Sequence, residues 1–345
     1  MLLFILLHHI LVDLVIRLPG RLGGGTVADL VALAAELIPF FFLPLPLWIL
    51  TALLARTRSG LIAAAVPWVL FAWLYGGLFI PRSMRVADVG AQPPPTIRVL
   101  TFNLLNTNRS ADQIAALVKT VEPDVICVQE LESDLARALD ARLAATYPNK
   151  WLVPDGAGAG AGIWSRHRLL SQEAWDPSAV TDRWQHVTLR KDGSLFHVVN
   201  LHLNSPSPTM RRRARIPVPI VTGIDPNQRR AEVAYLEPRL RALVARLEPA
   251  IVVGDLNLTD QTPEYRDLIA AGLIDAHRTA GWGFGFTFPA TPLTRVLGRP
   301  FPPRPFVRID YVLHSSELRA LNVQVWPTAP GSDHHPVIAD LALTD

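Results

Sequence analysis

Two uncharged apolar runs near the start of the chain constrain its fold more than any other feature. Residues 37–55 and 61–80 are 19 and 20 residues long and contain no charged side chain. A helix rises about 1.5 Å per residue, so each run can cross the roughly 30 Å hydrocarbon core of a bilayer. The short segment between them permits a helical hairpin. The runs predict two transmembrane helices, and a buried hydrophobic subdomain is the alternative.

An additional apolar segment, residues 2–16, is interrupted by His8, His9 and Asp13. It is compatible with a third span, an interfacial helix or a signal-like segment. We therefore expect a membrane anchor of two to three helices over residues 1–90 and a stiff proline-rich linker at 91–96. Beyond the linker, residues 97–345 form a second expected domain of ordinary globular composition, which we expect to fold without the anchor.

The location implied by these segments is the cell membrane, with several passes. Four arginines flank the two strongest spans on their outer ends and two lie in the loop between them. This count favours a cytoplasmic location for residues 97–345, because positively charged loops tend to stay in the cytoplasm. A difference of two residues leaves the side of the membrane open.

Charge is unevenly distributed along the chain. Residues 1–90 hold six Arg and four acidic residues, whereas the rest holds 27 basic and 26 acidic residues. A nearly neutral domain argues against a protein that coats nucleic acid through bulk electrostatics. Cys127 is the single cysteine, so no intrachain disulfide can form and the compartment is not indicated.

The second part of the chain alternates between strand and helix patterns. Helices are predicted at residues 110–122, where Ser110 and Gln113 form a possible capping box, and at 227–247. Short apolar runs predict strands at residues 97–102, 124–129, 196–203, 250–254, 308–313 and 337–341. This alternation indicates a layered α/β domain.

Polar residues recur where these predicted strands end, and loops at one end of a sheet converge. Glu130 and Asn103 offer the oxygen ligands that Mg²⁺ or Mn²⁺ prefers, with Asp333 as a further ligand. Asp255 and Asn257 alternate along an extended segment, so one can orient water while the other contacts phosphate. Together with Asp310 and His334, these residues predict a site that cleaves phosphodiesters.

His334 is a candidate phosphate contact or general acid, and Asp310 can hold its ring in the required tautomer. Any one of these polar residues is more often a turn or helix cap than a catalyst. Their repetition after successive strands favours a shared site. His335 has no expected catalytic role.

Seven stretches, in order along residues 96–345, resemble the endonuclease/exonuclease/phosphatase superfamily, which includes DNase I-like nucleases and neutral sphingomyelinases. The stretches are VLTFNLLNTN (99–108), PDVICVQELES (123–133), VVNLHLNSP (198–206), IVVGDLNLTDQTPEY (251–265), TFP (287–289), RIDYVLHS (308–315) and GSDHHPVIADL (331–341). The resemblance implies two packed β-sheets flanked by helices, with the site at one edge of the sandwich.

The resemblance also implies individual roles. It makes Asn103 and Glu130 metal-site residues, with Asp333 secondary, and His202 a phosphate contact. The remaining catalytic residues implied are Asp255, Asn257, Asp310 and His334. The expected reaction is metal-dependent hydrolysis of a phosphoric ester by in-line attack of activated water.

The substrate stays open between nucleic acid and a phospholipid headgroup. The arginines of residues 211–215, together with Arg229, form a basic patch that favours an endonuclease, and Trp282 and Phe286 can stack on bases. Asn204 is a further substrate-binding candidate. A membrane anchor instead favours a lipid-headgroup phosphodiesterase or phosphatase, since tethering concentrates such a substrate. A catalytically inactive binding or scaffold domain is the alternative from another class. The sequence indicates no protein partner.

Overall fold

The computed structural model describes most of the chain. The described residues are 26–56, 58–80, 95–156, 158–175, 184–211, 220–292, 294–296, 299–301 and 305–344. The apolar segment at 2–16, most of the expected linker at 91–96 and the arginines at 212–215 lie outside these residues.

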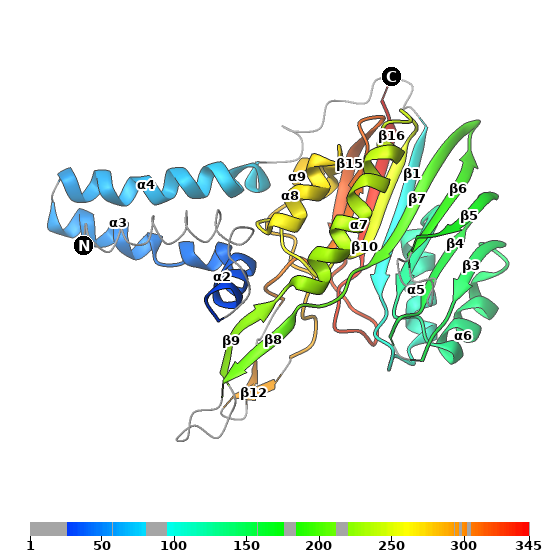
Figure 1. Cartoon of the computed structure of the whole chain (residues 1–345), viewed down its shortest axis with the longest axis horizontal. Coiled ribbons are helices and arrows are strands. Elements are labelled where there is room, and N and C mark those ends of the chain that lie inside the picture. Colours follow the sequence, from blue (N-terminus) through cyan, green and yellow to red (C-terminus); the bar gives the residue numbers. More distant parts are fainter. Residues whose placement is uncertain are drawn as a thin grey trace.

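The N-terminal region is helical and extends to one side of the molecule (Figure 1). Its elements are α2 (Thr26–Glu36), η1 (Ile38–Phe42), α3 (Leu45–Ala55), α4 (Arg58–Tyr75) and η2 (Gly76–Phe79). The apolar run that begins at residue 37 is split into η1 and α3, because a proline ring cannot continue the helical hydrogen bonding. Pro44 caps the start of α3, and Arg56, in the left-handed conformation, ends it.

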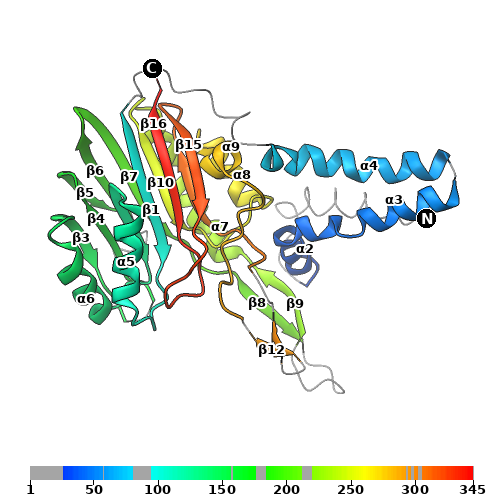
Figure 2. The ribbon, with the colours of Figure 1, turned by 180° about the vertical axis from the view of Figure 1, so that it is seen from behind.

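Two helical segments, Ile38–Ala55 and Arg58–Phe79, are long and apolar enough to cross a membrane. Figures 1 and 2 show α3 and α4 lying side by side as a hairpin. Many of their large apolar side chains point outward, and Leu47, Leu54 and Trp73 are 60%, 74% and 77% exposed. The expectation of apolar N-terminal helices is therefore confirmed.

Two six-stranded mixed sheets form the main part of the remaining chain. The first, in spatial order, contains β15 (Leu318–Val325), β16 (Val337–Leu343), β1 (Thr96–Asn103), β2 (Val125–Gln129), β4 (Ala161–Ser165) and β3 (Asn149–Val153). The second contains β11 (Ile274–Asp275), β14 (Asp310–His314), β10 (Ala250–Asp255), β7 (Ser194–His202), β6 (Gln185–Lys191) and β5 (Leu169–Ala174). The predicted two-sheet α/β sandwich is confirmed.

Helices cover the outer faces of both sheets (Figure 2). Helices α5 (Ala111–Val121) and α6 (Ser133–Leu143) pack on the first sheet, and α7 (Asn227–Val244) and α8 (Pro263–Ala270) pack on the second. A separate core fills the space between the sheets, with Val99, Cys127, Val198 and Val253 fully buried. Because both faces of each sheet are covered, the central strands read as continuous apolar runs.

Three small elements complete the fold. They are α9 (Ala276–Ala280), the hairpin of β8 (Ser207–Arg211) with β9 (Ile220–Asp225), and the hairpin of β12 (Thr294–Val296) with β13 (Arg299–Phe301). Both hairpins project beside α2 at the same end of the molecule (Figure 1).

The capping box expected at the start of α5 does not form. Ser110 is the N-cap residue, but its side chain makes no capping hydrogen bond. Its backbone N–H instead donates to Asn108 Oδ1 at 2.8 Å, and Asn108 is itself held by the carbonyls of Leu104 and Pro330. The local competition from Asn108 explains why this sequence signature was wrong.

Candidate active site

Strand register aligns three site residues in one row of the second sheet. Asp255, the last residue of β10, pairs with His202 of β7 on one side and with Asp310 of β14 on the other. In the first sheet, Asn103 ends β1 opposite Gln129, and Glu130 follows directly. The strand ends of both sheets thus meet at one rim of the sandwich.

Gly254 permits the close approach of β7 and β10 beneath this row. Its φ of +137° is rarely adopted by other residues, and a Cβ there would lie 1.8 Å from the Leu201 carbonyl oxygen. Asn257, three residues later, also has a positive φ of 51°. Its side chain donates to the Leu203 carbonyl at 2.8 Å, and its backbone N–H donates to Asp255 Oδ1 at 2.9 Å. These bonds fix the orientation of the Asp255 carboxylate.

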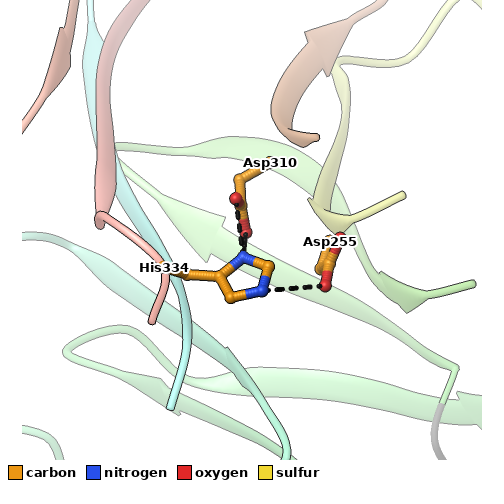
Figure 3. Close-up of side chains that lie close together, drawn as sticks. All are labelled: Asp255, Asp310 and His334. Atoms are coloured by element: carbon orange, nitrogen blue, oxygen red, sulfur yellow. Dashed lines mark hydrogen bonds and ion pairs between the residues drawn. The ribbon is translucent and has the colours of Figure 1, made fainter. Parts of the chain in front are cut away.

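Asp310, His334 and Asp255 form an array in which the imidazole ring contacts one carboxylate through each nitrogen (Figure 3). His334 Nδ1 lies 2.9 Å from Asp310 Oδ2, and His334 Nε2 lies 3.7 Å from Asp255 Oδ2. The loop before β16 delivers His334, because Ser332 Oγ donates to the Asn103 carbonyl and accepts from the His334 N–H. A ring held at Nδ1 by a carboxylate presents Nε2 to the reaction centre.

Burial and neighbouring charges shift both titrating ends of this array. Burial lowers the pKa of His334, but the carboxylates of Asp310 and Asp255 outweigh it, so the net pKa is raised. Burial raises the pKa of Asp255, and the nearby His334 only partly opposes this. The imidazole therefore favours its protonated form, and Asp255 becomes a stronger base than an exposed aspartate.

Glu130 faces the same row from the other sheet. Asn103 Nδ2 donates to Glu130 Oε1 and to Asp255 Oδ2, both at 3.0 Å, and so links the two sheets. His202 Nε2 lies 3.9 Å from Glu130 Oε1 and 3.7 Å from Asp255 Oδ2. The backbone N–H of Asn106 donates to Glu130 Oε2 at 3.1 Å. The expected metal and catalytic residues are therefore brought together.

A cleft of about 420 Å³ opens over these groups. It is lined by Asn106, Glu130, Gly158, Ala159, His202, Leu203, Asn204, Ser205, Asp255, Asn257, Phe288, Ile309, Asp333 and His334. The Phe288 ring lies 4.8 Å from the His334 ring and shields one face of it from water. All eight expected catalytic and metal residues either line the cleft or, like Asn103 and Asp310, contact a residue that does.

The donor set fits a hard divalent cation. Glu130 and Asp333 both line the cleft, and Asp333 has a raised pKa through burial, with Glu130 and Asp310 adding to the increase. Gathered carboxylates of this kind are what Mg²⁺ neutralises in proteins. Asp255, Asp310 and His334 also offer ligand atoms within 4.8 Å of one another. In that group, however, the His334 ring already lies between the two aspartate carboxylates. The position next to Glu130 therefore suits a cation better.

Three expected substrate-binding residues do not line the cleft. Arg229 is only 2% exposed and is engaged by Glu36, 2.7 Å away. The Phe286 ring stacks on Phe40 at 6.0 Å, and the Trp282 ring lies 6.3 Å from Phe79. These side chains pack against the N-terminal helices, whose proximity the sequence did not reveal. Asn204 does line the cleft and is held by Glu232 through its backbone N–H at 2.8 Å.

Several supporting residues were not identified from the sequence. Thr287 Oγ1 accepts from the N–H groups of Ile309 and Asp310 and fixes the start of β14. Gln129 Nε2 donates to Asn200 Oδ1 at 2.6 Å across the interior between the sheets. Thr287, Gln129 and Asn106 all lie inside the stretches that resemble the family, which was the available signal. Asn106 acts through its backbone N–H, so its side chain gave no further indication.

The chain is similar to proteins of one known family. Residues 100–334 match the model of the endonuclease/exonuclease/phosphatase family. An endonuclease/exonuclease/phosphatase structure from Bacteroides vulgatus is 21% identical with a TM-score of 0.56, covering 72% of this chain and 100% of its own. No curated protein matches the chain.

Two further structures share the fold. Truncated TDP2 of Caenorhabditis elegans is 20% identical with a TM-score of 0.53, covering 72% of this chain and 98% of its own. The mannosyl-6-phosphatase Bt3783 of Bacteroides thetaiotaomicron is 18% identical with a TM-score of 0.53, covering 72% of this chain and 100% of its own. At these identities the likeness establishes the fold alone.

Proposed function

Because the chain belongs to the endonuclease/exonuclease/phosphatase family, a family of phosphoric ester hydrolases, we propose that it is a membrane-anchored, divalent-metal-dependent phosphodiesterase. The observation that carries the proposal is the convergence of Glu130, His202, Asp255 and His334 on one cleft. Hydrolysis of a phosphodiester requires an activated water, neutralised phosphate oxygens and a stabilised leaving oxygen. These side chains can meet each requirement.

Glu130 would hold Mg²⁺ or Mn²⁺, with Asn103 beside it and Asp333 as a secondary ligand. The ion would supply Lewis-acid neutralisation of the phosphate oxygens and of the charge that develops on the leaving oxygen. Asp255, whose pKa is raised by burial, accepts the proton of the attacking water. His334, held by Asp310, donates from Nε2 to a phosphate oxygen, and His202 contacts the same group. Asn257 keeps the Asp255 carboxylate oriented for in-line attack.

The N-terminal helices support a multi-pass anchor in the cell membrane. Ile38–Ala55 and Arg58–Phe79 have the required length and hydropathy, and their exposed apolar surface suits lipid. We propose residues 1–90 as the anchor, residues 91–96 as the linker and residues 97–345 as the catalytic domain. The arginine count favours a cytoplasmic catalytic domain.

A phospholipid headgroup is the second candidate substrate beside nucleic acid. Of the side chains expected to grip or stack on nucleic acid, Arg229 and Phe286 are engaged by the N-terminal helices. Trp282 contacts Phe79 but stays 60% exposed, and the arginines at 212–215 lie outside the described residues. This weakens the support for an endonuclease. Helices of membrane-spanning character beside the catalytic sheets support a substrate that itself lies in the membrane.

Turnover by the purified full chain tests the proposal. The protein in detergent micelles is assayed with bis-p-nitrophenyl phosphate and Mg²⁺ or Mn²⁺, then with plasmid DNA, abasic duplex DNA, sphingomyelin and phosphoinositides. We expect turnover of the small diester that is lost with EDTA and restored by added metal. The absence of turnover at every metal concentration would contradict the proposal and favour a binding or scaffold domain.

A further inference from the structure

Glu36 connects the N-terminal helices to the cleft. It is the last residue of α2, and its side chain is only 11% exposed. Its Oε1 accepts from Arg229 Nη2 at 2.7 Å, and its Oε2 accepts from the backbone N–H of Thr259 at 3.0 Å. One carboxylate from outside the family-matched region thus binds two points of the catalytic domain.

Arg229 links Glu36 to the active-site loop that contains Asn257. Its guanidinium is 2% exposed, and its Nη1 donates to the backbone carbonyl of Asn257. A buried guanidinium requires an anion. Glu36 is the nearest carboxylate, because Glu264 lies 3.9 Å away and also pairs with Arg230 at 3.3 Å.

The loop held in this way carries a strained catalytic residue. Asn257 has a positive φ of 51°, a conformation that is sparsely populated outside glycine. Such a conformation persists only where the surroundings hold it. Here Arg229 holds the Asn257 carbonyl, and Glu36 holds the Thr259 N–H two residues later. The same Asn257 orients Asp255 through its own backbone N–H.

The position of Glu36 is itself fixed by the packing of α2 against β9. A Cβ at Gly223 would lie 2.5 Å from the Asp29 side chain, so α2 passes too close for any other residue. Asp29 Oδ2 accepts from Thr209 Oγ1 at 2.8 Å on the neighbouring strand β8. Asp29 therefore anchors α2 to the hairpin without touching the loop that contains Asn257.

We propose that Glu36 is a positioning residue for the hydrolysis: the N-terminal helices complete the active site by holding the Asn257–Thr259 loop through Arg229. This inference rests on the proposed function. It gives the N-terminal helices a role in ordering the active site in addition to anchoring the protein. A catalytic domain lacking residues 1–90 would have Arg229 without its nearest carboxylate and a Thr259 N–H without its acceptor. Its loop would be less well ordered.

Replacement of the carboxylate by an amide isolates this role. Glu36→Gln keeps the shape but has one acceptor oxygen, so its NH₂ must face either the Arg229 guanidinium or the Thr259 N–H, and both are donors. We expect kcat on bis-p-nitrophenyl phosphate to fall by about tenfold to a hundredfold, because small misplacements of reacting groups have effects of this size. KM is expected to stay within about twofold, since Glu36 contacts no substrate.

The full chain in detergent micelles is compared with Asp29→Asn, the control that alters the same helix at a site away from the loop. Asp29→Asn keeps an oxygen that can accept from Thr209 Oγ1, so α2 should stay in place and the wild-type kcat is expected. Glu36→Asp keeps both acceptor oxygens on a shorter arm and is expected to give an intermediate kcat with unchanged KM, even if Glu36→Gln unfolds. Each variant is assayed well below its Tm.

Three results would overturn the inference: a wild-type kcat in Glu36→Gln, equal losses in Glu36→Gln and Asp29→Asn, or, if Glu36→Gln unfolds, a wild-type kcat in Glu36→Asp. In each of these the proposed function survives, because the wild type still turns over. A wild-type chain without turnover would overturn both proposals.

Discussion

The N-terminal helices and the two-sheet domain expose different surfaces. Among the described residues, the exposed large apolar side chains of the two-sheet domain are Leu170, Leu247 and Trp282, whereas all the others lie between Val27 and Ile80. The sandwich has three packed cores, one between its sheets and one beneath each helical layer. The helical hairpin has only small clusters. The sandwich is therefore stabilised from within, whereas the hairpin exposes apolar surface that suits the membrane environment proposed for it.

The boundary between the two regions is nevertheless specific. Arg278 donates to the Leu74 carbonyl, and the Gly283 N–H donates to the Leu78 carbonyl at 2.8 Å. The Phe284 ring lies 5.4 Å from Tyr75 and 5.3 Å from Phe79. Such directional contacts indicate that the hairpin has a fixed orientation on the domain and is more than a flexible tether.

Loss of the catalytic groups should have the largest effect and should leave the helical region unaffected. Glu130→Ala and His334→Ala are each expected to lower kcat/KM by at least about a thousandfold, or roughly 4 kcal/mol of transition-state stabilisation. Steady-state turnover of bis-p-nitrophenyl phosphate measures this. The control is Asp134→Ala, whose carboxylate is 64% exposed on α6. Turnover near the wild-type level in both variants would refute the site.

A charge introduced into the helical hairpin should have the opposite effect: it should weaken membrane insertion and leave turnover unchanged. Leu47, 60% exposed, lies near the middle of the segment Ile38–Ala55. Leu47→Arg is expected to weaken membrane insertion by about 3 kcal/mol and to leave soluble-diester turnover intact. Membrane flotation measures the first effect. Leu247→Arg, at a 74% exposed position of the catalytic domain, is the control and should not change flotation. Equal flotation of both variants would argue against a membrane-spanning hairpin.

Acid should destabilise the segment next to the boundary through His277, whose Nε2 lies 3.0 Å from the Gly283 carbonyl oxygen. Burial, followed by the nearby Arg308, lowers the pKa of His277 to about 4. The unfolded chain has a histidine pKa of about 6.5, so it binds more protons than the folded chain between these values. Stability is thus full above pH 6.5 and is lost as the pH falls toward 4, by about 2 to 3 kcal/mol. His277→Gln should flatten the dependence of Tm on pH over this range, and an unchanged slope would contradict the assignment.

The aromatic contacts at the boundary should contribute least. Phe284→Ala removes ring contacts with Phe71, Tyr75, Phe79 and Phe286. We expect a loss of about 1 to 2 kcal/mol, because Phe284 is only half-buried. Hydrogen exchange at the Gly283 amide measures it, since that N–H bonds to Leu78. Unchanged protection would show that the rings do not hold the hairpin in place.

The alternation of strand and helix patterns predicted a layered α/β domain, and the family resemblance supplied its two-sheet arrangement. The cluster at the rim could be predicted because its residues follow local strand patterns. Asn103, Glu130, Asp255 and Asp310 each end or begin a recognisable apolar strand, so their convergence follows from parallel and antiparallel pairing. Six strands of the two sheets were not predicted: β3, β4, β5, β6, β11 and β15. The edge strands β3 and β5 are only partly buried or exposed and carry weaker patterns. The more deeply buried β4 and β6 contain glycine or polar residues that interrupt an apolar run.

Contacts between remote segments could not be predicted in this way. Glu36 and Arg229 are separated by almost two hundred positions, and neither belongs to a motif that announces the other. Arg229, Trp282 and Phe286 were therefore assigned to substrate, although they contact the helices. The one available signal was Glu36 itself, an acidic residue next to an uncharged apolar run.

The central claim is that one cleft holds a divalent cation and a phosphate group at Glu130. Electron–nuclear double resonance of the Mn²⁺-loaded full chain with added inorganic phosphate tests it directly. We predict a ³¹P coupling to the bound Mn²⁺ in the wild type and its loss in Glu130→Gln. A wild type without ³¹P coupling, or a Glu130→Gln variant with the same coupling, would contradict the claim.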